Sequence, residues 1–261
     1  MAGTALLAGV CLTIPSDTGY AASSKSSVMS SHSGLNTSPS WVLIDQSAVS
    51  DQDELVKGAK SFIQSVADRG LSFLANDELT FDERKKEFRS LLLDSFDIRT
   101  IGRFSIGRYW RKATREQRAE YLELFREMII QVYSSRFDEY SGQVLEVTNA
   151  RPEGEKDAIV TTKIVSENAA DVIVRWRVRF SDNKYQIVDV IIEGVSMLVT
   201  QRSDFAAVIQ RGGGEVEVLL EHLREKVDEY EAKNEQERRE QELIQETKAA
   251  QDTKDSRAAE Q

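Results

Sequence analysis

The most regular pattern in the chain lies in residues 114–140, where apolar side chains recur every three or four positions. Thr114, with Gln117 three residues later, is typical of the capping box that begins a helix, and Gly142 is a stop signal. The pattern predicts one amphipathic helix roughly 40 Å long. Its apolar stripe must cover either a core or a bound apolar ligand. The stripe consists of Tyr121, Leu122, Phe125, Met128, Ile129, Val132, Tyr133 and Phe137.

Helical spacing also occurs on both sides of this stretch. Before it, apolar stripes predict helices in residues 53–74, 80–96 and 98–110, the second beginning at a capping box of Thr80 and Glu83. After it, residues 197–210 and the chain from Val216 onward have helical spacing. Three glycines, Gly212–Gly214, separate these last two segments. No Lys-Ser/Thr pair follows them, so they are interpreted as a linker or helix end and not as a phosphate loop.

Between Gly142 and Gly194 the apolar period changes to two, which predicts strands. They cover residues 144–147, 158–166, 170–180 and 185–193, and their short connections imply an antiparallel sheet. In the third strand, apolar side chains alternate with Arg175, Arg177 and Arg179. We interpret the arginine row as a solvated face, with a surface for acidic headgroups or an acidic partner as the functional alternative. The fold class is therefore α+β, an antiparallel sheet with helices.

Composition divides the chain into four parts. Residues 1–22 contain a short apolar run followed by small residues, which predicts a secretory signal peptide, with a buried N-terminal helix as the alternative. Residues 23–50 are Ser-rich and predict a disordered spacer, and residues 51–226 form the domain. Residues 227–261 are almost entirely polar and charged, so we expect a solvated tail that is partly helical or disordered.

The charge and residue types exclude several classes of function. The 261 residues have a net charge of −10, which argues against nucleic acid as a partner. No apolar run reaches the roughly 20 residues that span a bilayer, so we expect no stable membrane insertion. One cysteine, Cys11, and two distant histidines, His32 and His222, leave little material for a metal site. No catalytic motif is present, and Asp189, inside an apolar strand, is interpreted as a structural carboxylate.

Two stretches, residues 106–143 and 185–226, carry several short motifs in a fixed order and spacing. The most specific are Tyr109–Thr114, Gln117–Arg118, Phe125–Glu127 and Glu193–Met197. Together these motifs resemble the MlaC/toluene-tolerance family of periplasmic phospholipid-binding proteins. The resemblance covers about residues 53–226 and does not extend to the Ser-rich segment or the charged tail.

The resemblance implies a curved antiparallel sheet wrapped by helices around a deep apolar pocket. It implies a periplasmic phospholipid carrier with no enzymatic activity and no cofactor, whose bound phospholipid is cargo. The implied partners are an inner-membrane MCE-protein/ABC transporter complex and an outer-membrane lipoprotein–porin complex, between which the carrier maintains outer-membrane lipid asymmetry. The alternative is a small-molecule enzyme or a scaffold protein on a cone-shaped α+β fold, which would purify without phospholipid.

Enclosing acyl chains requires a large apolar pocket, near the top of the usual range of roughly 300–1,000 Å³. Candidate lining residues come from one face of the sheet and from the apolar stripes of the helices, and for each the alternative is ordinary core packing. The candidates are Phe104, Tyr109, Phe125, Ile129, Tyr133, Val172, Val174, Trp176, Val178, Val190, Val195 and Met197.

Overall fold

The computed structural model describes residues 46–166 and 169–259, so the predicted signal peptide and residues 23–45 of the predicted spacer lie outside the described residues. The α-helices are α2 (Gln46–Leu74), α3 (Phe81–Ser95), α4 (Ile98–Ile106), α5 (Arg115–Ser134), α6 (Met197–Arg211) and α7 (Val216–Ala259), with short 3-10 helices η1 (Gly107–Arg111) and η2 (Phe137–Glu139). The strands are β1 (Val144–Glu153), β2 (Asp157–Ser166), β3 (Ala169–Ser181), β4 (Lys184–Ile192) and β5 (Val195–Ser196).

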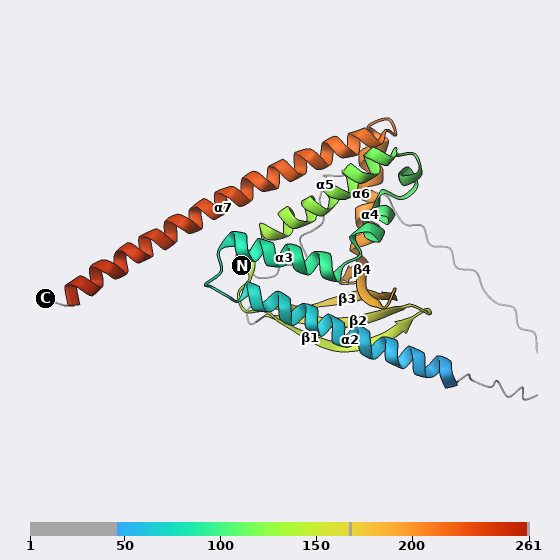
Figure 1. Ribbon diagram of the computed structural model, residues 1–261, viewed down its shortest axis with the longest axis horizontal. Coiled ribbons are helices and arrows are strands. Elements are labelled where there is room, and N and C mark those ends of the chain that lie inside the picture. The colour runs from blue at the N-terminus through green and yellow to red at the C-terminus, as the bar shows by residue number, and fades with distance from the viewer. Residues whose placement is uncertain (1–45, 167–168, 260–261) are drawn as a thin grey trace, which may run out of the picture.

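The strands form one antiparallel sheet in the order β1-β2-β3-β4-β5, each strand paired with the next (Figure 1). Trp176 on β3 lies opposite Val160 on β2 and Val190 on β4, so their side chains share one face. The predicted α+β class and its four strands are confirmed. The two-residue strand β5, which precedes α6, was not predicted.

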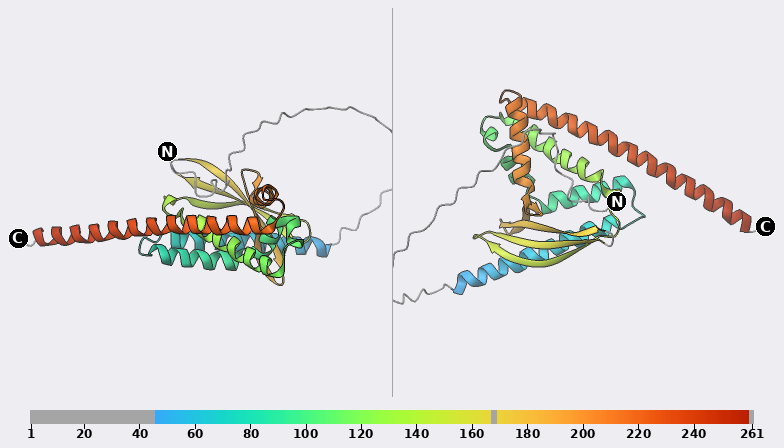
Figure 2. Two further views of the ribbon diagram at one scale, coloured as in Figure 1. Left: turned by 90° about the horizontal axis from the view of Figure 1, so that it is seen from above. Right: turned by 180° about the vertical axis from the view of Figure 1, so that it is seen from behind.

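The helices lie on one face of this sheet (Figures 1 and 2). α2 crosses the sheet, and its Leu55, Ala59 and Ile63 are buried against strand residues such as Val160 and Val178. α3, α5 and α7 lie progressively further from the sheet, and α4 and α6 stand at one end (Figure 1). A second apolar cluster joins α5, α6 and α7 and includes the buried Tyr121, Phe205, Leu219, Leu220 and Leu223.

The long central helix begins as predicted but ends earlier. Thr114 and Gln117 form the expected capping box, and α5 then stops at Ser134 instead of running to residue 140. Beyond it the chain turns so that Phe137 packs against the rings of Phe73, Phe81 and Phe88. The aromatic contact ends the helix, because a continuous helix would carry Phe137 along the axis of α5 and away from these rings. α5 is therefore roughly 30 Å long.

Two predicted boundaries also differ. α2 begins at Gln46, so the last residues of the predicted spacer are helical. The predicted solvated tail is the continuation of α7, a single helix from Val216 to Ala259. Its first part packs along α5, where the side chain of Asn234 is buried, and its last part extends away from the body (Figure 1). Residues 227–241 are helical and mostly exposed or half-buried, but Asn234 and Gln241 among them contact α5 and the chain that follows it.

Candidate functional site

A half-open apolar cavity of about 340 Å³ lies between the sheet and the helices and is lined by parts of α2, α3, α4, α5 and α6. Its volume is near the lower end of the usual range for ligand pockets, roughly 300–1,000 Å³, and not near the top as predicted. Long flexible side chains such as Met128 and Met197 line the wall and reduce the open space. The cavity is the candidate site.

Local structure explains why these side chains point into the cavity. On α5, Phe125, Ile129 and Tyr133 are spaced by four residues and therefore share one side of the helix. On β3, Val172 and Trp176 are separated by an even number of residues and share the inner face. The apolar side of the amphipathic helix α5 and the apolar face of the amphipathic strand β3 thus form opposite walls of the cavity.

The structure brings together seven of the twelve predicted site residues around this cavity. They are Phe125, Ile129, Tyr133, Val172, Trp176, Val190 and Met197. All seven come from α5, the inner face of β3 and β4, and the first turn of α6. These are the elements whose apolar periodicity was most regular in the sequence.

Two predicted residues on the inner face of β3, Val174 and Val178, lie outside the cavity wall. Both are fully buried in the cluster that joins the sheet to α2. The indole Nε1 of Trp176 donates a hydrogen bond of 2.9 Å to Thr162, the cross-strand partner of Val174. The indole therefore reaches across this part of the face and, together with α2, separates Val174 from the cavity.

Three further predicted residues also lie elsewhere. Phe104 and Val195 are on the surface, with exposed fractions of 39% and 51%. Tyr109 is buried in the cluster of α5, α6 and α7, where its hydroxyl accepts a hydrogen bond of 3.2 Å from Arg108. Helical spacing identified Phe104 and Tyr109 as apolar positions. Phe104 lies within α4 on its exposed side, whereas Tyr109 lies in η1, where the chain no longer follows the axis of α4.

The prediction missed the wall contributed by α2 and α3. Phe73 and Leu74 near the end of α2, and Phe88, Leu91 and Leu92 on α3, line the cavity. Their helical stripes are visible in the sequence. A stripe alone does not distinguish a side chain that faces a cavity from one that faces a neighbouring side chain.

Several polar groups in the wall form hydrogen bonds within the protein. The carboxylate of Asp189 accepts hydrogen bonds from the Ser196 hydroxyl at 2.7 Å and the Leu198 backbone N–H at 3.1 Å, which fixes the start of α6. The Ser105 hydroxyl donates to the carbonyl of Ile101 at 3.0 Å. Burial raises the pKa of Tyr133, against the opposing effect of Arg136, so the phenol stays neutral at physiological pH. Apart from Arg136 and Asp189, the wall therefore presents an uncharged surface suited to hydrocarbon.

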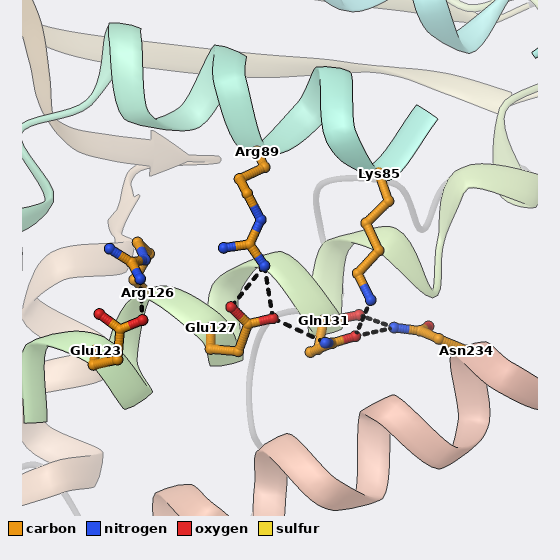
Figure 3. A network of polar contacts seen from close by, with 7 residues as sticks. All are labelled: Lys85, Arg89, Glu123, Arg126, Glu127, Gln131 and Asn234. Atoms are coloured by element: carbon orange, nitrogen blue, oxygen red, sulfur yellow. Dashed lines mark hydrogen bonds and ion pairs between the residues drawn. The ribbon is translucent and has the colours of Figure 1, made fainter. Parts of the chain in front are cut away.

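A polar network lies behind the α5 wall and joins three helices (Figure 3). Lys85 of α3 donates to Oε1 of Gln131 on α5 at 2.8 Å. Asn234 of α7 donates to the carbonyl oxygen and Oε1 of Gln131 at 3.0 and 2.7 Å. Burial lowers the pKa of Lys85, and the nearby carboxylate of Glu127 opposes this. Gln131 therefore holds α3 and α7 to the helix that forms the cavity wall.

Replacing Gln131 with leucine is expected to destabilise the protein by about 1–3 kcal/mol, because it leaves the amide of the buried Asn234 without its side-chain acceptor. Chemical denaturation measures the change. Gln241→Leu, which removes an exposed hydrogen bond to Asp138, is the matched control and is expected to change stability by less than about 0.5 kcal/mol. If Gln131→Leu changed the free energy of unfolding as little as Gln241→Leu does, the network would not stabilise the fold.

The fold and the cavity define an α+β protein with an apolar pocket between an antiparallel sheet and a helical layer. A sequence model of the family described as MlaC protein matches residues 64–225, more than half of the chain. The chain belongs to the MlaC family.

Individual relatives agree with this assignment. The chain is 28% identical to the toluene tolerance protein ttg2D of Pseudomonas putida over 114 residues, which are 44% of this chain and 53% of that protein. It is 21% identical to the intermembrane phospholipid transport system binding protein MlaC of Haemophilus influenzae over 179 residues, 66% of this chain and 81% of that protein. The chain thus spans about half of the length of the first relative.

A solved structure supports the fold. A phospholipid-binding protein from Ralstonia solanacearum, solved in complex with a phospholipid, superposes with a TM-score of 0.59 at 22% identity. The match covers 66% of this chain and 98% of that chain. Within the described residues, no helix combines the length and the apolar character needed to cross a bilayer.

Proposed function

We propose that this protein is a periplasmic phospholipid carrier that holds acyl chains in the apolar cavity. The observation that supports the proposal most strongly is the cavity itself, which lies within the span matched by the family. Its walls contain the largely uncharged side chains that hydrocarbon requires. A relative named as a phospholipid transport binding protein and a fold neighbour solved with phospholipid support the same cargo.

The energetics explain why such a carrier is needed. Two acyl chains contain about 30 methylenes, each worth about 0.8 kcal/mol on removal from water, which gives an upper bound near 24 kcal/mol. A free phospholipid therefore does not cross an aqueous compartment at a useful rate. We further propose that the protein exchanges its cargo with an inner-membrane MCE-protein/ABC transporter complex and an outer-membrane lipoprotein–porin complex.

Native mass spectrometry and lipid extraction of the purified protein test the proposal. A carrier is expected to arrive with phospholipid in a fixed ratio to protein, and the ratio should fall when the cavity is blocked. A purified, folded protein that carries no phospholipid and takes none from vesicles would favour the alternatives of an enzyme or a scaffold.

A further inference from the structure

The segment from Ile98 to Arg115 is strongly basic within an acidic chain. It contains six basic residues and no acidic residue, while the whole chain has a net charge of −10. The segment covers α4, η1 and the first residue of α5, which lie at one end of the molecule beside α6 (Figure 1). The basic residues are Arg99, Arg103, Arg108, Arg111, Lys112 and Arg115.

These cations form no ion pair with the other described residues, which is also true of Lys57, Lys60 and Arg175; they are distinguished by lying close together in a segment without a carboxylate. On α2, α3 and α7, by contrast, Arg69, Arg89 and Arg224 pair with carboxylates at 2.9 Å or less. Arg108 and Lys112 lie over the ring of Tyr109, and Arg202 of α6 lies 4.8 Å from the ring centroid of Phe104. The end of the molecule formed by α4, η1 and α6 therefore carries an excess of positive charge, with Asp204 as the one carboxylate of α6.

Exposed apolar side chains lie among these charges. Phe104 is 39% exposed, and Val199, one turn before Arg202 on α6, is 57% exposed. A Cβ placed on Gly107 would lie 3.0 Å from Nε of Arg202, so the α6 arginine reaches directly onto the end of α4. Arg202 thus joins the exposed sides of the two helices at Phe104 and Gly107. We give the name α4–α6 surface to these exposed residues of α4, η1 and α6: Arg99, Arg103, Phe104, Arg111, Val199 and Arg202.

The helices that carry this surface also form a wall of the cavity. Ile101 and Ser105 of α4 and Leu198 and Gln201 of α6 line the cavity. Their immediate chain neighbours point outward, Phe104 before Ser105 and Val199 after Leu198. Anything bound to the α4–α6 surface is therefore separated from the cavity by these two helices alone.

We propose that the α4–α6 surface docks reversibly on a membrane surface that carries anionic phospholipid headgroups. The inference rests on the proposed function, because the complexes with which the carrier is proposed to exchange cargo lie in membranes, so the carrier approaches a membrane surface when it meets them. Basic side chains beside exposed apolar groups are the combination that holds proteins at an anionic interface. Without residues 98–115, the remainder of the protein has a more negative net charge than the whole chain. An anionic membrane therefore repels this remainder and turns the basic end toward the membrane.

The same charges fit an acidic protein partner less well. In a protein interface, complementary charges fix the register of one partner on the other. Residues 98–115 contain only one sign, and a planar layer of headgroups requires no register. A membrane surface is therefore the occupant that the charge pattern favours.

Co-sedimentation with vesicles tests the proposal. The full chain is expected to bind vesicles of phosphatidylglycerol, to bind those of phosphatidylcholine much more weakly, and to be released by salt. The combined variant Arg99→Gln, Arg103→Gln and Arg111→Gln removes three exposed cations that form no ion pair with the described residues and lie outside the cavity wall. It is expected to bind phosphatidylglycerol vesicles on the order of a hundredfold more weakly, about fivefold per arginine.

A matched variant removes the same charge elsewhere. Lys57→Gln, Lys60→Gln and Arg175→Gln alter exposed cations of α2 and β3 and are expected to leave most of the vesicle binding intact. Equal losses in the two triple variants, or equal binding to both kinds of vesicle, would overturn the proposal. So would a protein that purifies with phospholipid yet binds no anionic vesicle, and this result would leave the carrier function standing. A protein without phospholipid in its cavity would instead contradict the carrier function.

Discussion

Replacing Ile129 with tryptophan is expected to remove most of the bound phospholipid while the protein remains folded. Ile129 lies on the cavity side of α5, so a larger side chain can extend into space that acyl chains would occupy. Bound phosphorus per protein and the melting temperature measure the two parts of this result. The comparison must use delipidated wild-type protein, because a bound ligand itself raises the apparent stability.

The substitution Val174→Trp gives the matched control. Val174 is fully buried between the sheet and α2 and lies outside the cavity wall. A tryptophan there overpacks a dense core and is expected to cost about 1–3 kcal/mol or more, and the molecules that stay folded should keep their lipid. The two positions were equivalent candidates in the sequence, but the structure predicts opposite effects on stability and on lipid content.

Two results would contradict the assignment of the cavity. If Ile129→Trp protein retained its full complement of phospholipid, the cavity would not hold the cargo. If Ile129→Trp melted as far below delipidated wild type as Val174→Trp does, position 129 would be core and not wall. Loss of lipid in the Ile129 variant alone, with stability retained, supports the proposal.

The difference between positions 129 and 174 also shows how far sequence periodicity reaches. A period of two correctly placed Val172, Val174, Trp176 and Val178 on one face of β3. It could not show that α2 and the indole of Trp176 cover part of that face, because this depends on side chains from other elements. Strand positions follow from local chemistry, while the boundary between cavity and core depends on how the helices lie across the sheet.

Helix ends show the same limit. The start of α5 was predictable because its cap, Thr114 with Gln117, is local in the sequence. Its end was not, since Phe137 turns back to rings from α2 and α3 that lie far away in the chain. The extent of α7 was missed for the same reason. The buried Asn234 donates its hydrogen bond to Gln131, which lies 103 residues earlier in the chain. The local sequence shows only a polar residue in a charged segment, so it predicts that Asn234 is solvated.

Truncations of α7 are expected to separate its structural part from its projecting part. A chain that ends at Gly214 loses four buried side chains: Val216, Leu219, Leu220 and Leu223. At about 1.5–3 kcal/mol each, their burial is worth roughly 6–12 kcal/mol, which is comparable to the whole stability of a typical domain. This chain is therefore expected not to fold, and circular dichroism and co-purified lipid should both show the loss.

Shorter truncations locate the boundary. A chain that ends at Gln241 keeps the buried contacts of α7. It also keeps the hydrogen bonds that Asn234 donates to Gln131 and Gln241 donates to Asp138. It is expected to melt and to bind lipid like the full chain. A chain that ends at Lys233 loses Asn234 and is expected to be less stable by about 1–2 kcal/mol while still binding lipid.

If the chain ending at Gln241 lost its lipid with the fold intact, the projecting part of α7 would have a role in cargo binding. If the chain ending at Gly214 folded and carried lipid, α7 would be an appendage, and the cluster of α5, α6 and α7 would not be part of the stable core.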